Sequence, residues 1–149
     1  KNVGFDEVVG VEPSRASARQ APDSVRHLID ETFFDEGNYE PGTYSLVTCF
    51  QVLEHVDDAA ELAHAVFRLL KPGGVFLTVS HDYRSFTARI LGHRSPIFDL
   101  SHLQLFSRSS LKELYRQAGF GKFDVQSMSN NYPISYWIKL SLINLKLKK

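Results

Sequence analysis

This chain has 149 residues, of which 43% are hydrophobic and 23% charged, enough for one globular domain with a core and too few for two domains. Its 17 basic and 17 acidic residues give a formal net charge of zero, which argues against a general nucleic-acid binder. No signal-peptide pattern opens the chain, and no apolar run approaches the roughly 20 residues that span a bilayer, so we expect a cytoplasmic protein. The sole cysteine, Cys49, is expected to be a small buried apolar residue.

The first third of the chain predicts two short strands with a helix between them. Residues 7–11 form a β-branched run, residues 14–21 have the composition of a helix, and residues 25–29 are a weaker strand candidate. Polar residues follow each strand: Glu12 comes after the first, and the Asp-Glu-Thr run at 30–32 comes after the second. A turn-rich stretch then leads to the middle of the chain.

The middle of the chain predicts a strand, a loop, a helix and a strand in that order. Residues 44–49 are typical of a buried strand, and residues 59–70 of a helix. The predicted apolar face of that helix consists of Leu62, Ala63, Val66, Phe67 and Leu70. The Lys-Pro-Gly-Gly run at 71–74 predicts the end of the helix, and residues 75–80 predict a second buried strand. Such a unit belongs to a parallel sheet, whose ligand-facing edge then lies at residues 50–55.

The last third begins with a long loop, residues 81–106, in which a short helix is expected near 85–91. Loops of this length inside compact domains are usually lids or binding loops. Ser110 and Glu113 predict a capping box at the start of a helix that ends at Gly119.

A further strand is predicted over residues 120–126, followed by an apolar and basic segment at 134–149. The segment has more apolar residues than a narrow amphipathic stripe, so it needs a large covering surface. Our first interpretation is a helix packed on protein, and the alternative is a peripheral helix at a membrane surface.

Four motifs together carry a family resemblance: Glu12, the run Phe-Gln-Val-Leu-Glu-His-Val at 50–56, the Lys-Pro-Gly-Gly run at 71–74, and a His-x-x-x-Phe pattern at 102–106. Over residues 7–126 the chain resembles the class I S-adenosylmethionine-dependent methyltransferases, especially the branch of ubiquinone-type O-methyltransferases and related small-molecule methyltransferases. The resemblance implies an α/β fold with a doubly wound, mostly parallel, Rossmann-like sheet.

The resemblance also predicts that this sheet is incomplete. The family's first strand and its Gly-rich loop have no counterpart, because the only early glycines, Gly4 and Gly10, open no strand-to-helix turn. The chain is expected to enter the fold at the second strand, with the missing strand between the strand ending at Glu12 and the strand at 44–49. The expected organisation is a single partial methyltransferase domain over 1–149, with a core at 7–126, a lid or acceptor loop at 81–106 and the apolar-basic segment at 134–149.

Glu12 is the first candidate cofactor residue, because a carboxylate at a strand end can accept hydrogen bonds from both hydroxyls of a ribose. The alternative is a solvated acid or a helix cap. The resemblance implies the ribose of S-adenosylmethionine, with Asp30 or Glu31 near the adenine. It also implies that Phe50 and Gln51 wall the methionine end and one adenine face.

Two histidines are the candidate catalytic residues. His81 follows a predicted strand, and His102 opens the His-x-x-x-Phe pattern. Histidine acts as a base near neutral pH, so either residue could deprotonate an acceptor hydroxyl, although a loop-pinning hydrogen bond is an equal alternative for His102. Glu54 has a structural explanation near a helix amino terminus. No histidines stand at metal-ligand spacing, so no metal is expected.

The expected activity is methyl transfer from S-adenosylmethionine to a small-molecule acceptor, through a hydroxyl. One alternative is a non-catalytic methyltransferase-like scaffold or partner module. Another is a nucleotide-binding oxidoreductase, which the absence of a Gly-rich loop disfavours.

Overall fold

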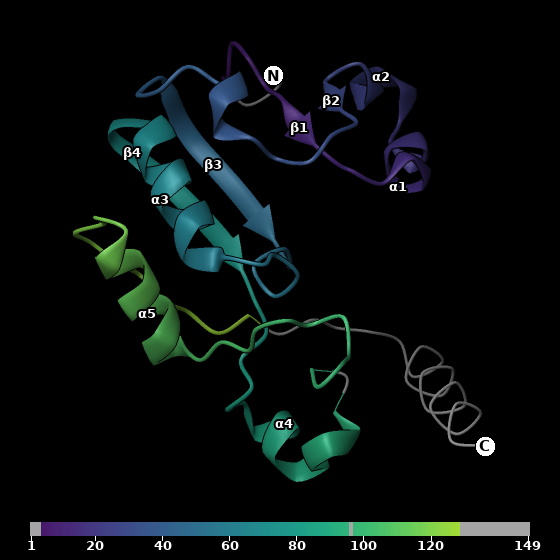
Figure 1. The fold of residues 1–149 in the computed structure, drawn as a ribbon, viewed down its shortest axis with the longest axis vertical. Coiled ribbons are helices and arrows are strands. Elements are labelled where there is room, and N and C mark those ends of the chain that lie inside the picture. The colour runs from purple at the N-terminus through teal and green to yellow at the C-terminus, as the bar shows by residue number, and fades with distance from the viewer. Residues whose placement is uncertain (1–3, 96, 129–149) are drawn as a thin grey trace.

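Two pairs of parallel strands form the framework of the computed structural model, which describes residues 4–95 and 97–128 (Figure 1). In the first pair β1 (Gly10–Val11) lies beside β2 (Ile29–Asp30), and in the second β3 (Tyr44–Phe50) lies beside β4 (Leu70–Val79). The helical elements are α1 (Arg15–Gln20), α2 (Asp23–Arg26), η1 (Glu36–Asn38), α3 (Ala59–Leu69), α4 (Phe86–Leu91), η2 (Gly92–Arg94) and α5 (Arg108–Gln117). Parallel strands need crossover connections, and helices supply them here, in agreement with the predicted α/β class.

The first two predicted strands are shorter in the structure. The β1 strand pairs only over two residues, with the Gly10 amide donating to the Leu28 carbonyl at 2.8 Å and the Glu12 amide to the Asp30 carbonyl at 3.0 Å. The strand predicted over 25–29 is wrong before Ile29, because residues 23–26 form α2. Proline pre-sets the backbone for a helix start and an acidic first turn favours the helix dipole, and α2 has Pro22 before it and Asp23 in its first turn.

Helix α3 matches its prediction in extent but not in its buried face. The Asp58 carboxylate accepts from the Ala60 and Glu61 amides, both at 2.9 Å, and so caps the helix. The buried residues of the helix are Ala59, Ala63, Ala65, Val66 and Leu69. Phe67 is 43% exposed and lies at the edge of that face, where its ring packs edge-on against the Phe120 ring.

Helices cover one face of the β3–β4 pair. Phe76 packs against Tyr115 of α5, with ring centroids 5.6 Å apart, and the Thr78 and Tyr115 hydroxyls are hydrogen-bonded at 2.7 Å. Val75 and Leu77, whose side chains alternate with these, are 54% and 48% exposed. The strands predicted to be buried are therefore half-buried, because nothing in the described part of the chain covers these two residues.

The Lys-Pro-Gly-Gly run lies inside β4 rather than in a turn before it. Helix α3 ends at Leu69, and β4 begins at Leu70, opposite Tyr44, with an irregular register between Tyr44 and Leu46. Gly74 passes so close to β3 that a Cβ there would lie 2.9 Å from the carbonyl oxygens of both Tyr44 and Lys71. The motif therefore permits close backbone approach as the chain passes from helix to strand.

The substitution Gly74→Ala is expected to lower the free energy of unfolding by about 1–3 kcal/mol, because the added methyl group must displace backbone atoms. Urea unfolding measures the effect. Gly121→Ala is the matched control, since no atom lies within 4 Å of the corresponding Cβ position. Its free energy of unfolding should change by less than about 0.5 kcal/mol, and equal losses in the two variants would contradict the close approach.

The carboxyl-terminal elements differ from prediction at two places. Helix α5 begins at Arg108, three residues early, because Ser107 and Ser110 form the capping box, while Glu113 bonds to Arg116 at 2.6 Å instead. Its predicted end is confirmed at Gly119, whose φ is +107°. No strand forms over residues 120–126, where no backbone pairing with another described strand occurs. The segment at 134–149 lies outside the described residues.

The long loop contains the predicted short helix as α4, capped by Ser85, at the opposite end of the molecule from α1 and α2 (Figure 1). The two ends of this loop lie side by side, because Asp82 and Phe106 form a parallel bridge and the Tyr83 amide donates to the Phe106 carbonyl at 3.0 Å. Among the described residues, no helix has the length and apolar character needed to cross a membrane.

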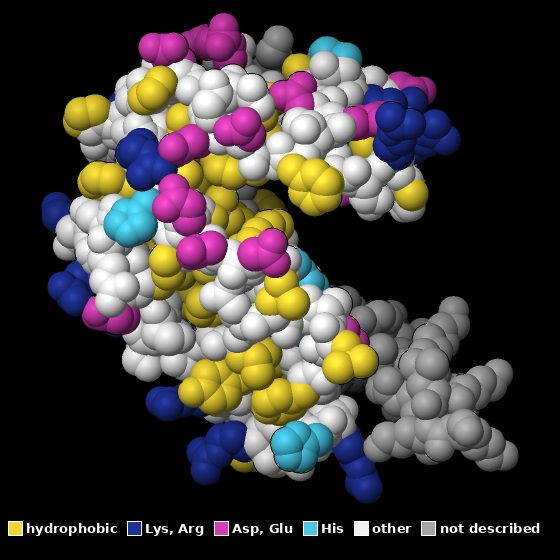
Figure 2. Space-filling model, viewed as in Figure 1, with side chains coloured by type: hydrophobic (Ala, Val, Ile, Leu, Met, Phe, Trp, Pro, Cys, Tyr) yellow, Lys and Arg dark blue, Asp and Glu magenta, His cyan; other side chains and the backbone are white. Residues whose placement is uncertain are grey.

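Among the described residues the two strand pairs are separate sheets, with a gap between β1 and β3, and Figure 2 shows a notch that opens on the right of the molecule, below α1 and α2. Near the amino ends of the strands, a pocket of about 400 Å³ is lined by Glu7, Val8, Val9, Leu28, Tyr39 and Tyr44. In a parallel ladder, alternate residues direct their amide and carbonyl groups to opposite sides. Because Gly10 and Glu12 bond towards β2, Val11 directs its backbone groups towards the other side of β1. The first pair therefore has an edge with which no strand of residues 4–95 and 97–128 pairs.

Candidate functional site

Three histidines meet beyond the carboxyl ends of β3 and β4. The ring centroids of His55 and His102 are 4.8 Å apart, and those of His81 and His102 are 5.6 Å apart. His102 is half-buried and His55 is exposed. The structure thus brings the two predicted catalytic residues together and adds a third imidazole, His55.

Backbone carbonyls determine which ring nitrogen carries the proton in two of these histidines. The His102 Nδ1 lies 2.7 Å from the Ile97 carbonyl oxygen, and the His55 Nδ1 lies 2.9 Å from the Ser101 carbonyl oxygen. A carbonyl oxygen only accepts, so Nδ1 donates in both contacts. In the neutral imidazole this leaves Nε2 with its lone pair, the arrangement that a proton acceptor needs. His102 thus has the loop-pinning bond of the alternative interpretation and an Nε2 that can accept a proton.

Glu54 connects the segments that carry these histidines. It is 1% exposed, and its Oε1 accepts from the His81 amide at 2.8 Å. Its own carbonyl accepts from the Leu103 amide at 2.8 Å. Sequence reasoning missed this role because the partners are distant along the chain. The available signal was an acidic side chain directly after an apolar pair, Val52 and Leu53.

Two other titratable groups lie near Glu54 in the core and stay protonated at neutral pH. Burial, with a smaller contribution from the Glu54 charge, raises the pKa of the Cys49 thiol to about 11. Burial also raises the pKa of the Tyr115 hydroxyl to about 12, against the opposing effect of its hydrogen bond to Thr78. Neither group can act as a base near pH 7, so the histidines remain the candidate bases of this cluster.

Phe50 and Gln51 occupy the carboxyl end of β3. The Phe50 side chain is 56% exposed, so it offers a flat apolar surface at the sheet edge. Gln51 has a φ of +54°, and its amide donates to the Val79 carbonyl at 2.7 Å, so the chain turns immediately after β3. A positive φ is uncommon for a residue other than glycine and is found at functional sites more often than elsewhere.

The other candidate cofactor residues lie at the ends of β1 and β2. The Glu12 Oε1 accepts from the Ser14 amide at 2.8 Å, while the cap of α1 is Ser14 itself, whose hydroxyl accepts from the Ser17 amide. Its Oε2 makes no hydrogen bond within the described residues. Asp30 accepts from the Tyr39 hydroxyl at 3.4 Å, and Glu31 lies 3.7 Å from the Arg15 guanidinium.

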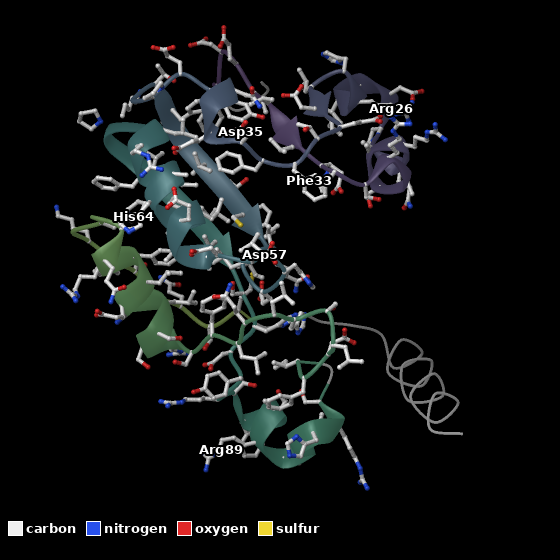
Figure 3. The ribbon with its side chains drawn as sticks, in the orientation of Figure 1. Arg26, Phe33, Asp35, Asp57, His64 and Arg89 are labelled. Carbon is white, nitrogen blue, oxygen red and sulfur yellow. The ribbon has the colours of Figure 1, made fainter. Side chains whose placement is uncertain are left out.

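Phe33 lies close to the residues at the ends of β1 and β2, and the sequence analysis did not predict a role for it. It follows β2 by three residues, and its side chain is 79% exposed (Figure 3). An exposed aromatic ring beside polar strand ends is suited to stacking on a flat ligand. The signal that could have identified it is the pair of phenylalanines directly after the predicted strand end.

A second pocket, of about 470 Å³, opens beside α4 in the long loop of residues 81–106. Its lining consists of Tyr83, Arg84, Ala88, Arg89, Gly92 and Phe98. The Arg84 guanidinium lies over the Tyr83 ring, 5.5 Å from its centroid, and Arg89 lies on α4 in Figure 3. In the ranges 4–95 and 97–128, no group of three or more His, Cys, Asp or Glu side chains is arranged to hold a metal ion.

Comparison with known proteins finds relatives that are all described as methyltransferases. The sequence profile of a family described as "Methyltransferase domain" matches residues 1–123. A ubiquinone biosynthesis O-methyltransferase from Sodalis glossinidius is 34% identical over 96 residues, which are 62% of this chain and 38% of that protein. A ubiquinone biosynthesis O-methyltransferase from Bordetella pertussis is 35% identical over 109 residues, 68% of this chain and 45% of that protein. The chain therefore spans less than half the length of these relatives.

The structure also resembles a solved one, from Thermotoga maritima. That protein is described as an S-adenosylmethionine-dependent methyltransferase and a possible histamine N-methyltransferase. The two superpose with a TM-score of 0.63 at 25% sequence identity, over 77% of this chain and 55% of the other.

Proposed function

This chain belongs to the class I S-adenosylmethionine-dependent methyltransferases, and from that premise we propose that it is part of an enzyme that methylates a hydroxyl group of a small molecule. Methyltransferases of this family use S-adenosylmethionine as the methyl donor. The observation that carries the proposal is the histidine cluster at the carboxyl ends of β3 and β4, where His102 retains an Nε2 lone pair.

The residues at the strand ends fit the adenosine part of S-adenosylmethionine. Glu12 has one carboxylate oxygen that no described residue bonds, which suits a ribose hydroxyl. Phe50 and Phe33 present exposed rings suited to adenine, and Gln51 has an exposed amide that can donate and accept. We place Asp30 and Glu31 on the adenine side, as second candidates.

When bound, the cofactor supplies a sulfonium methyl group, which is already a strong electrophile. The work left to the protein is to align the acceptor oxygen and to remove its proton. His102 Nε2 takes the hydroxyl proton as the oxygen forms its bond to the methyl carbon. His81 lies beside His102 and orients the acceptor.

The lid supplies the acceptor pocket in this proposal. Its rings, Tyr83 and Phe98, suit a flat apolar group, and its guanidinium groups, Arg84 and Arg89, suit an acidic one. A phenolic or acidic hydroxyl compound therefore matches the lining better than a cationic amine does.

We also infer that the gap between β1 and β3 accommodates the family's first strand in the complete sheet. The support is the unpaired edge of β1 and the apolar lining of the pocket, with Val8 and Val9 42% and 40% exposed. In a doubly wound sheet the loop after that strand approaches the cofactor. The described residues would then form the adenosine side of the site and, through Phe50 and Gln51, one wall of its methionine end.

The ribose assignment can be tested by substitution of Glu12. The variant Glu12→Ala is expected to weaken S-adenosylmethionine binding by about 1.5–3 kcal/mol, because charge-assisted hydrogen bonds to the ribose are lost. Saturation-transfer NMR follows the adenine and ribose protons even when affinity is weak. Glu12→Gln is the matched control for the contact with Ser14, since its side-chain oxygen can still accept from the Ser14 amide. Equal binding by wild type and Glu12→Ala would disprove the assignment.

A further inference from the structure

We propose that Glu54 is a positioning residue that holds His81 and His102 in register with each other at the site. The inference rests on the proposed function, in which these imidazoles deprotonate and orient the acceptor. Glu54 itself need not touch the acceptor. Its contribution is to join the backbone segments that carry the two rings.

The side chain of Glu54 fixes the first segment. The carboxylate Oε1 accepts from the His81 amide at 2.8 Å, directly after β4. Glu54 is 1% exposed, and its neighbour Leu53, at 0%, belongs to the core cluster with Ala59 and Phe106. The buried Leu53 therefore holds the Glu54 carboxylate in place, and the hydrogen bond from the His81 amide positions the His81 backbone relative to that carboxylate.

The backbone of Glu54 fixes the second segment. Its carbonyl accepts from the Leu103 amide at 2.8 Å and from the Gln104 amide at 3.4 Å, immediately after His102. The Gln104 side-chain amide donates a hydrogen bond to the Val56 carbonyl at 2.9 Å. This bond holds the segment after His102 against the loop that follows β3. One residue thus connects the chain on both sides of the histidine pair.

The contribution of Glu54 to stability does not by itself explain why a carboxylate is buried at this position. The Glu54 Oε2 is buried and has no hydrogen-bond partner among the described residues, and the same holds for the hydroxyl of Ser80, the residue before His81. A buried polar atom without a partner is unfavourable, because it loses its hydrogen bonds to water. Buried polar groups of this kind are retained in some proteins because they specify one arrangement over others. The arrangement specified here is that of the two imidazoles.

Three variants separate the hydrogen bond from the charge and the volume. Glu54→Gln keeps an oxygen that can accept from the His81 amide, whereas Glu54→Met has similar length and no acceptor. Glu54→Asp keeps the charge but is one methylene shorter. Val66→Ala, in the buried face of α3, is the control for a general loss of core packing.

The first readout is NMR of the histidine-labelled 149-residue chain. Wild type and Glu54→Gln are expected to show nuclear Overhauser effects between the His81 and His102 rings, which lie 5.6 Å apart. Glu54→Met and Glu54→Asp are expected to lose them, while Val66→Ala keeps them despite lower stability. Retention of the ring contacts in Glu54→Met would overturn the proposal. If that variant does not fold, Glu54→Asp decides in the same way.

The second readout is turnover of the complete enzyme, of which this chain is part in the proposed function. Misplacement of the imidazoles in Glu54→Met should lower turnover by roughly 10²-fold with cofactor affinity preserved, and Glu54→Gln should restore most of it. Normal turnover in a folded Glu54→Met would also overturn the proposal. Absence of methyl transfer by the complete wild-type enzyme would instead overturn the proposed function, and the NMR comparison would still decide whether Glu54 positions the rings.

Discussion

In the complete enzyme, the variant His102→Gln is expected to lose about 10²-fold or more in methyl-transfer turnover, with S-adenosylmethionine affinity nearly unchanged. Glutamine has a similar size, and its amide nitrogen can donate to the Ile97 carbonyl as Nδ1 does. It has no basic nitrogen, so it cannot take the proton of an acceptor hydroxyl near neutral pH. The loss should therefore appear in turnover and not in cofactor binding.

The measurement is acceptor-dependent formation of S-adenosylhomocysteine, with a panel of phenols, sugars and hydroxy acids as probes. His27→Gln is the matched control, because His27 is an exposed histidine at the end of α2 and makes none of the contacts of the cluster. That variant should retain turnover within about two-fold. Full activity in His102→Gln would reduce His102 to a residue that pins its loop.

The 149-residue chain by itself is expected to bind S-adenosylmethionine with a dissociation constant near 1 mM or weaker. The loss relative to micromolar binding corresponds to about 4 kcal/mol. The physical reason is the gap between β1 and β3, where no described strand pairs with the edge to which Val11 directs its backbone groups. In the complete sheet, the Gly-rich loop that follows the family's first strand would hold the methionine part of the cofactor.

Calorimetric titration of the monomeric chain tests this expectation. A thermal-shift series with the same ligand gives an independent estimate, since a ligand that binds the native state raises its apparent stability. S-adenosylhomocysteine, which shares the adenosine part, should bind as weakly. Micromolar affinity of the isolated monomer would show that the described residues already hold both parts of the cofactor and that the gap needs no further strand.

Local patterns in the sequence predicted the elements whose formation depends on near neighbours. The strand β3, the helices α3 and α4 and the end of α5 at Gly119 all occur where hydrophobic spacing, caps and glycine indicated. The predictions were wrong where the structure depends on strand pairing or on a helix start that competes with a strand. Residues 25–28 had strand-like composition, but the proline and aspartate before them start a helix. Residues 120–126 have strand-like composition and no strand partner among the described residues.

By itself, then, the sequence determined the α/β class, the parallel unit around β3 and β4, and the histidines and carboxylates at strand ends, because these follow from short-range periodicity and residue chemistry. Only the tertiary structure decided that His81 and His102 face each other across 5.6 Å and that the buried Glu54 joins their segments. Contacts between residues more than twenty positions apart depend on how the strands and loops pack. No local pattern encodes that distance, since the free energy that selects it comes from burial and hydrogen bonding of the whole core.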